Sequence, residues 1–250
     1  MQLNVLPDDE VQRTYRRALG LWSSHLSDEM AFGSAAVYAN ANLARIPEAN
    51  CVLGEVADDQ SIPIADYFKS ANTAPLAWYL PAGAPAKTWP PMRDRHLVLL
   101  RLAALPTQLP QTHPELTIIP ARASFRHVRQ IAAAIRPEIP PDQAGDAACF
   151  HLDDSHVDAL LALHDGQAAG FACVLSTGQA GMITDLFVLP PLRHRGYAQA
   201  LAGQLLQICV RAMFQHVVCA VDAQDAQAIR FAARIGFVEK GRAAWRSGCV

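Results

Sequence analysis

The 250-residue sequence lacks a strong charge bias, a long hydrophobic run and any pair of cysteines spaced for a redox or zinc motif. Its 21 Lys and Arg residues against 23 Asp and Glu residues give a formal net charge of −2. Because binding to a phosphate backbone needs a basic surface, this balance argues against a general nucleic-acid-binding protein. The longest apolar stretches, such as residues 168–175, fall far short of the ~20 residues that cross a bilayer, so no membrane association is predicted.

The few cysteines show no C-x-x-C spacing. Cys173, Cys209 and Cys219 lie inside apolar runs, which is typical of small core residues. The sequence therefore predicts neither a disulfide framework nor a metal site. The first residues contain no basic segment followed by an apolar run, so no secretory signal is expected. We predict a soluble, cytoplasmic protein.

The composition that is present indicates a folded chain with two parts. Hydrophobic residues make up 51% of the sequence and charged residues 18%, which excludes a disordered chain. Prolines are dense between Pro81 and Pro114, where they remove backbone donors and disfavour helix. We place a boundary near Pro114, which divides the chain into domains of residues 1–113 and 114–250.

The hydrophobic pattern predicts an α+β arrangement on both sides of this boundary. Before it, helices are expected over residues 9–22 and 64–70, and strands over residues 50–56, 76–80 and 96–102. After it, strands are expected over residues 116–120, 156–163, 168–175, 182–189, 217–221 and 237–245, and helices over residues 124–135, 196–214 and 225–235. The second domain therefore has the predicted order β-α-β-β-β-α-β-α-β.

A cluster of basic residues stands at the strand-to-helix junction of residues 186–198. A helix start exposes unpaired N–H groups and a partial positive charge, so Arg193, His194 and Arg195 are unfavourably placed there. A bound anion such as a pyrophosphate removes this conflict. Gly196 lets the backbone approach the anion closely. The segment predicts a phosphate site without the motif of a P-loop or of a dinucleotide fold.

The same segment carries a family resemblance. Residues 193–198, Arg-His-Arg-Gly-Tyr-Ala, fit the pattern [QR]-x-x-G-x-[GA] and resemble the cofactor loop of the GNAT acyltransferase superfamily. Residues 185–190 resemble the fourth strand of that family, and Ala228 with residues 236–237 resembles its second conserved block. The resemblance covers roughly residues 115–246 and implies a three-layer fold with a mixed, mostly antiparallel sheet flanked by helices. Residues 46–53 and 77–80 are weakly similar to a degenerate half of this kind.

The resemblance implies that acetyl-CoA is the co-substrate and that its acetyl group passes to an amine of a small molecule or peptide. The pyrophosphate would lie on the backbone of residues 193–198, and the pantetheine arm along the fourth strand in the manner of an added strand. A backbone N–H near Leu186 or Phe187 would stabilise the oxyanion. The implied cofactor-binding residues are Leu186, Phe187, Val188, Arg193, His194, Arg195, Gly196, Tyr197 and Ala198.

Two positions depart from the family pattern. The tyrosine that commonly protonates the leaving thiolate is replaced by Ala232, and the acidic residue that often serves as base is replaced by Thr184. Asp185 is then the nearest candidate base on that strand, acting through an ordered water. A non-catalytic acyl-CoA-binding module that regulates a partner is the alternative function.

Several residues have a structural interpretation beside the functional one. Tyr197 is expected to pack or to contact the cofactor, and His194 to meet solvent or phosphate rather than to act as base. Cys173 and Cys219 are expected in the core rather than as nucleophiles. Trp22, Trp78 and Tyr79 are expected either in the core or in an acceptor pocket; we expect the first domain to shape the acceptor site. The acceptor and the oligomeric state stay open.

Overall fold

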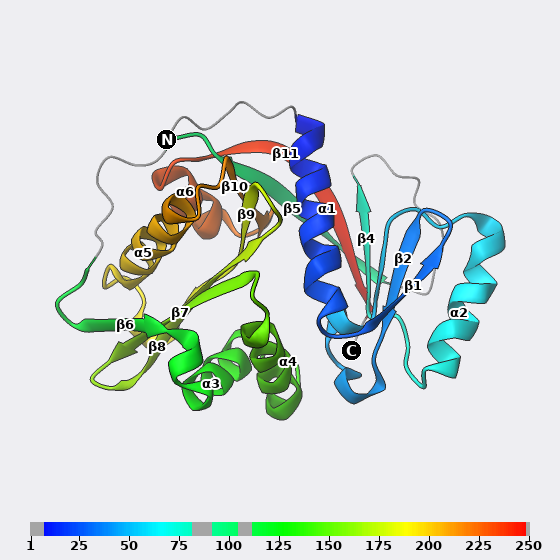
Figure 1. Ribbon diagram of the computed structural model, residues 1–250, viewed down its shortest axis with the longest axis horizontal. Helices are drawn as coiled ribbons and strands as arrows, with labels where there is room; N and C mark the ends of the chain where they lie inside the picture. Colours follow the sequence, from blue (N-terminus) through cyan, green and yellow to red (C-terminus); the bar gives the residue numbers. More distant parts are fainter. Residues whose placement is uncertain (1–7, 82–91, 105–111, 249–250) are drawn as a thin grey trace.

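One continuous sheet organises the residues that the computed structural model describes, which are residues 8–81, 92–104 and 112–248 (Figure 1). Its strand order is β1-β2-β3-β4-β11-β5-β10-β9-β8-β7-β6. Only the pairs β3–β4 and β9–β10 are parallel among these strands, and the remaining neighbours run antiparallel. The predicted mixed, mostly antiparallel α+β fold is therefore confirmed.

The elements follow in this order along the chain. The strands are β1 (Asp28–Phe32), β2 (Ala35–Ala39), β3 (Cys51–Leu53), β4 (Ala77–Pro81), β5 (Met92–Leu102), β6 (Leu116–Pro120), β7 (Val157–His164), β8 (Gln167–Ser176), β9 (Ala180–Val188), β10 (His216–Asp222) and β11 (Phe237–Gly248). The helices are α1 (Asp8–Ser24), α2 (Ser61–Ser70), α3 (Phe125–Ile135), α4 (Pro141–Asp153), α5 (Tyr197–Arg211) and α6 (Ala226–Arg234). None of these helices is long and apolar enough to span a membrane.

Every helix and strand predicted from the sequence is present, with ends shifted by a few residues. The predicted element order of the second half is wrong in one place, because helix α4 follows α3 directly and no element is predicted there from the sequence. Its start, Pro140-Pro141, suggests a break, yet proline is well suited to the first helical position. The hairpin of β1 and β2 is also absent from the prediction, because four of the five residues of β1 are exposed and give no buried apolar alternation.

The helices cover the two faces of the sheet according to the alternation of its side chains. On one face, Leu99 of β5 belongs to the apolar cluster formed with α1 and α3. On the other face, Val98 and Leu100 pack with α5, and Trp78 of β4 packs with α2. Because side chains alternate along a strand, a three-layer arrangement results, with α1 running across the middle of the sheet (Figure 1).

Two strands, β5 and β11, form the centre of the sheet, and each pairs with strands from the other half of the chain. Strand β5, from before Pro114, pairs with β10 and β11. Strand β11, from the end of the chain, pairs with β5 and with β4 of the first half. The order β3-β4-β11-β5-β10-β9 is thus symmetric about the β11–β5 pair, with a parallel pair at each end. The boundary near Pro114 stays a prediction, and hydrogen-bonded strands cross it.

We expect a fragment of residues 114–250 to lose cooperative folding. It would expose the edge of β10 and both edges of β11, and it would remove Leu99 and Leu102, which are fully buried. Thermal unfolding followed by circular dichroism should show a sharp transition for the whole chain and none for the fragment. Co-expression with residues 1–113 should restore the transition. A fragment that melts as sharply as the whole chain would contradict the structural role of β5.

Candidate functional site

Strands β9 and β10 separate part of the way along β9. Their parallel pairing runs from the pair Ala180 and His216 to the pair Ile183 and Cys219, whereas β9 continues to Val188. The separation coincides with a bulge in β9, where Thr184 has no partner residue on β8. Residues 184–188 of β9 therefore present one backbone edge to the gap between the two strands.

The ladder between β8 and β9 shows which backbone groups face this gap. The N–H of Leu189 donates to the carbonyl of Ala169 on β8 at 2.9 Å. Hydrogen-bonding direction alternates along an antiparallel strand, so Phe187 also bonds to β8 while Leu186 and Val188 direct their N–H and C=O groups into the gap. Of the two predicted oxyanion donors, Leu186 has its N–H in the gap and Phe187 does not.

The chain that follows β9 turns sharply into helix α5. His194 and Gly196 both have positive φ, 64° and 87°, and the glycine precedes the first helical residue. The carbonyl of Gly196 accepts the first bonds of the helix, and the N–H groups of Tyr197 and Ala198 have no acceptor within it. These donors and the helix dipole can hold an anion.

The basic residues surround this helix start. Arg193, His194 and Arg195 are exposed. The Nε of Arg193 donates to the carbonyl of Val188 at 3.0 Å, and its guanidinium lies 5.4 Å from the centre of the Phe187 ring. Arg193 is thereby held beside the open edge of β9. The arrangement can bind a phosphate-bearing ligand that runs from the helix start into the gap.

Tyr197 has a packing role in the structure. Its side chain is 1% exposed, its hydroxyl donates to Glu115 at 2.7 Å, and the same oxygen lies 3.0 Å from Nδ1 of His164. Burial and the bond to Glu115 raise the pKa of Tyr197. The hydroxyl is therefore engaged, and the residue offers an anion its backbone N–H.

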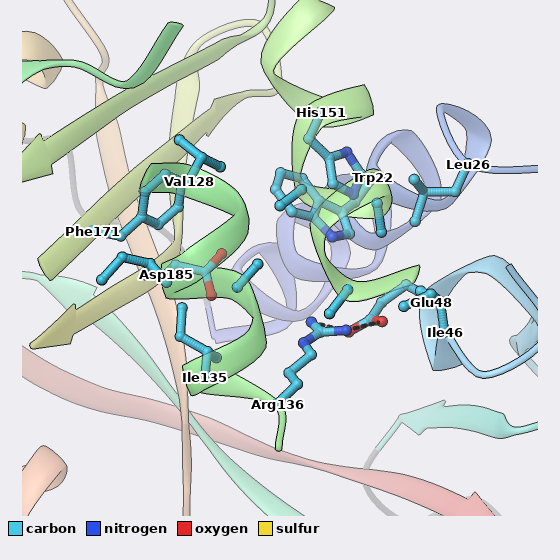
Figure 2. A pocket seen from close by; sticks show the side chains of 15 residues that line it. Trp22, Leu26, Ile46, Glu48, Val128, Ile135, Arg136, His151, Phe171 and Asp185 are labelled. Atoms are coloured by element: carbon cyan, nitrogen blue, oxygen red, sulfur yellow. Dashed lines mark hydrogen bonds and ion pairs between the residues drawn. The ribbon is translucent and has the colours of Figure 1, made fainter. Parts of the chain in front are cut away.

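A pocket with about 500 Å³ of space free of atoms, part of it open to solvent, lies beside Asp185 (Figure 2). It is bounded by α1, α3, α4, the segment before β3 and strands β8 and β9. The lining residues are Trp22, Leu26, Ile46, Glu48, Val128, Ile131, Ala132, Ile135, Arg136, Ala144, Ala147, Ala148, His151, Phe171 and Asp185. Most of them are apolar, and the first four come from the N-terminal half of the chain.

Three charged side chains stand on the pocket wall. Arg136 and Glu48 form a two-pronged ion pair in which both N–O distances are 2.7 Å. The pair raises the pKa of Arg136, and for Glu48 the effect of Arg136 outweighs burial and lowers the pKa. For Asp185, burial outweighs the attraction of Arg136 and raises the pKa of the carboxyl. A carboxylate with a raised pKa is a better proton acceptor than an ordinary surface aspartate.

His151 adds a neutral polar group to the pocket. Its ring stacks on Trp22 with the ring centres 3.4 Å apart, and it is 4% exposed. Burial, helped by His25 and Arg136, lowers its pKa well below the usual value. Both ring nitrogens lack a hydrogen-bond partner, so the imidazole has bonding capacity that the protein does not use.

The structure places the other predicted residues as follows. Trp22 lines the pocket, whereas Trp78 and Tyr79 are buried in the core. Cys173 is buried, and burial raises the pKa of the Cys219 thiol to about 12, so neither is a ready thiolate. The burial of Cys173 and the raised thiol pKa of Cys219 indicate that both cysteines are core residues and not nucleophiles.

Ala232 is the buried residue of α6 and packs in an apolar cluster, so its side chain supplies no acid to the leaving thiolate. Glu48, Arg136 and His151 were missed from the sequence. Glu48 and Arg136 are 88 residues apart, and no local pattern links them.

A second polar cluster lies outside this pocket. Oδ2 of Asp154 is 2.6 Å from Nε2 of His25, and its Oδ1 is 2.9 Å from Nδ1 of His156. These atoms lie close enough together to ligate a cation, yet each histidine already pairs with the carboxylate. The cluster joins the end of α1 to the segment between α4 and β7, and the absence of a metal stays a prediction.

Residues 125–237 match the sequence profile of the acetyltransferase (GNAT) family. A search of curated protein sequences finds no significant match.

Solved structures share the fold along most of the chain. A conserved protein of unknown function from Staphylococcus epidermidis is 16% identical with a TM-score of 0.63, covering 88% of this chain and 93% of its own. A GCN5-related N-acetyltransferase from Kribbella flavida is 14% identical with a TM-score of 0.60, covering 95% of both chains. A tandem GNAT protein from the clavulanic acid biosynthesis pathway is 12% identical with a TM-score of 0.52, covering 74% of this chain and 67% of its own.

Proposed function

We propose that this protein is an N-acetyltransferase that moves the acetyl group of acetyl-CoA to an amine of a small molecule or peptide, because residues 125–237 match the acetyltransferase (GNAT) family. One observation carries the proposal. Helix α5 begins at one end of the gap between β9 and β10, with free N–H groups and basic side chains that suit an anion, and Asp185 of the pocket follows the last β9–β10 pair by two residues. The two substrates of a transfer reaction can meet there.

The residues at the gap fit acetyl-CoA. The N–H groups of Tyr197 and Ala198, with Arg193 and Arg195, would hold the pyrophosphate. The backbone of Val188 and Leu186 would bond the pantetheine arm as an additional strand. Acetyl-CoA supplies the acetyl group as a thioester, and the N–H of Leu186 is the donor available to its carbonyl oxygen.

The apolar pocket is our proposed acceptor site. A primary ammonium has a pKa near ~10.4, so it must lose a proton before it can attack. Asp185 stands on the wall of the pocket and has a raised pKa, and it is our proposed base, directly or through a water. Thr184 and Ala232 supply no acidic group, so we propose that the thiolate leaves without an acid, as a thiol pKa of ~8.5 permits.

The absence of acidic groups at residues 184 and 232 also favours a second function, a regulatory module that binds acyl-CoA without transferring the acyl group. Both functions require the anion site at α5, and only the enzyme requires Asp185 to be ionised beside an amine. Turnover therefore separates them.

A screen of amine libraries with acetyl-CoA, read out as release of free thiol, tests the enzymatic function directly. We expect thiol release that depends on the amine and rises with pH, because the free amine accumulates. Mass spectrometry should show an acetylated product. Binding of acetyl-CoA without transfer to any amine, even at alkaline pH, would contradict the enzymatic function and support the regulatory module.

The role of the first half of the chain belongs to the same proposal. The first half of the chain is proposed to shape the acceptor site through Trp22, Leu26, Ile46 and Glu48. The cytoplasmic location and the absence of nucleic-acid and membrane partners stay predictions.

A further inference from the structure

The charges on the pocket wall restrict what it can bind. Four of its lining residues are titratable: Glu48, Arg136, His151 and Asp185. Arg136 and Glu48 neutralise each other, and His151 is neutral because burial lowers its pKa. When Asp185 is ionised, the wall therefore carries one net negative charge, which complements a single ammonium group.

The ion pair with Glu48 also neutralises Arg136, the cation on the pocket wall. Arg136 would otherwise be well suited to a carboxylate, because its guanidinium can bond both oxygens at once. Both of its terminal nitrogens already donate to the two oxygens of Glu48. A carboxylate entering the pocket would meet Asp185 and a guanidinium whose charge is already neutralised by Glu48, so the cost of its desolvation would not be compensated.

From this arrangement we infer that the acceptor is a small amine with one positive charge, an apolar body and no carboxylate, and that Glu48 sets this choice by occupying Arg136. The inference rests on the proposed function, since it identifies the pocket as the acceptor site. The apolar body follows from the walls formed by Trp22, Phe171 and Ile131. Glu48, which is proposed to set the preference, lies in the first half of the chain. Arg136, whose charge it neutralises, lies in the second half.

Pairs of compounds that differ by one carboxylate test the inference. Phenethylamine and phenylalanine form one pair, and isoamylamine and leucine form another. Calorimetry should show that the full-length chain binds each amine at least about tenfold more tightly than its amino acid, a difference of ~1.4 kcal/mol. Rates of acetyl transfer should follow the same order.

Glu48→Gln should remove this preference. It removes a negative charge and frees the guanidinium of Arg136, so the two amino acids should gain at least about tenfold in affinity relative to their amines. Glu138→Gln is the matched control, because it removes the same charge from an exposed residue two positions from Arg136 and outside the pocket. The control should keep the preference of the unchanged chain. The double variant Glu48→Gln with Arg136→Gln should lose the gain.

The outcomes separate the inference from the proposed function. Equal or tighter binding of the amino acids by the unchanged chain, or no binding of either amine, would overturn the inference. So would a preference that Glu48→Gln leaves unchanged while circular dichroism shows a folded variant. If the binding preference holds and no amine is acetylated, the enzymatic function fails, and what remains is a pocket that binds amines and rejects carboxylates through Glu48.

Discussion

Gly196→Glu is expected to lower the affinity for acetyl-CoA by well over tenfold, which corresponds to more than ~1.4 kcal/mol. The added carboxylate would stand at the start of α5, where the anion is proposed to bind, and it would repel the phosphates. Calorimetry with acetyl-CoA and with CoA measures the loss. Because the pyrophosphate is common to both ligands, their affinities should fall together.

The loss of affinity caused by the added charge must be distinguished from the effect of backbone strain at residue 196. Gly196 has a φ of 87°, so any side chain is strained there, although the nearest atom to an added Cβ is 3.6 Å away in His113. Gly178→Glu is the matched control, since Gly178 has a φ of 84° and nothing within 4 Å of an added Cβ. It lies in the turn before β9, at the end remote from α5 along the strand. Unchanged binding in a folded Gly196→Glu variant would refute the cofactor site.

Asp185→Asn is expected to lower kcat by about 10²-fold or more, which is the usual contribution of a general base. The substitution keeps the shape of the side chain and leaves the pair of Arg136 and Glu48 in place. The affinity for acetyl-CoA should not change, because the carboxylate lies on the acceptor side of β9. Steady-state kinetics with a saturating amine, together with calorimetry, measure the two effects.

The pH dependence adds a second readout. Burial raises the pKa of Asp185, so the base becomes active only above that raised value as the pH increases. In the unchanged chain, activity should rise with pH through ionisation of Asp185 and then through release of the free amine. Asp185→Asn should lose the first rise and keep the second.

Asp158→Asn on the exposed side of β7 serves as the control, and its profile should match that of the unchanged chain. Full activity in Asp185→Asn would remove Asp185 from the role of base.

The strand-to-helix junction before α5 could be predicted from the sequence because its parts are neighbours in the chain. Residues 186–198 hold the end of a strand, a glycine that tolerates positive φ and the first turn of an amphipathic helix. Each of these has a local signature, and together they place Arg193 and Arg195 at a helix start. The expected elements of the second half were found for the same reason, since hydrophobic periodicity reports the face that each element buries.

The acceptor pocket could not be predicted in this way. Glu48 precedes β3 and Arg136 follows α3, and they meet because α3, α4 and the end of α1 cover the same face of the sheet. His151 lies on α4, a helix whose proline-rich start suggests a loop. Neither the pairing of Glu48 with Arg136 nor the burial of His151 leaves a pattern in the residues around them.

The sequence by itself determined most of the helices and strands and the strand-to-helix junction that places basic residues at the start of α5, because these depend on residues within one or two turns of chain. Only the tertiary structure decided that β5 and β11 cross between the halves and that Glu48 occupies Arg136. Strand partners and buried ion pairs are selected by the packing of the whole molecule, since each requires two distant segments to lose water and to fit together. These strand pairs and this ion pair are stabilised only when the whole sheet and its helices are assembled, so no single segment predicts them.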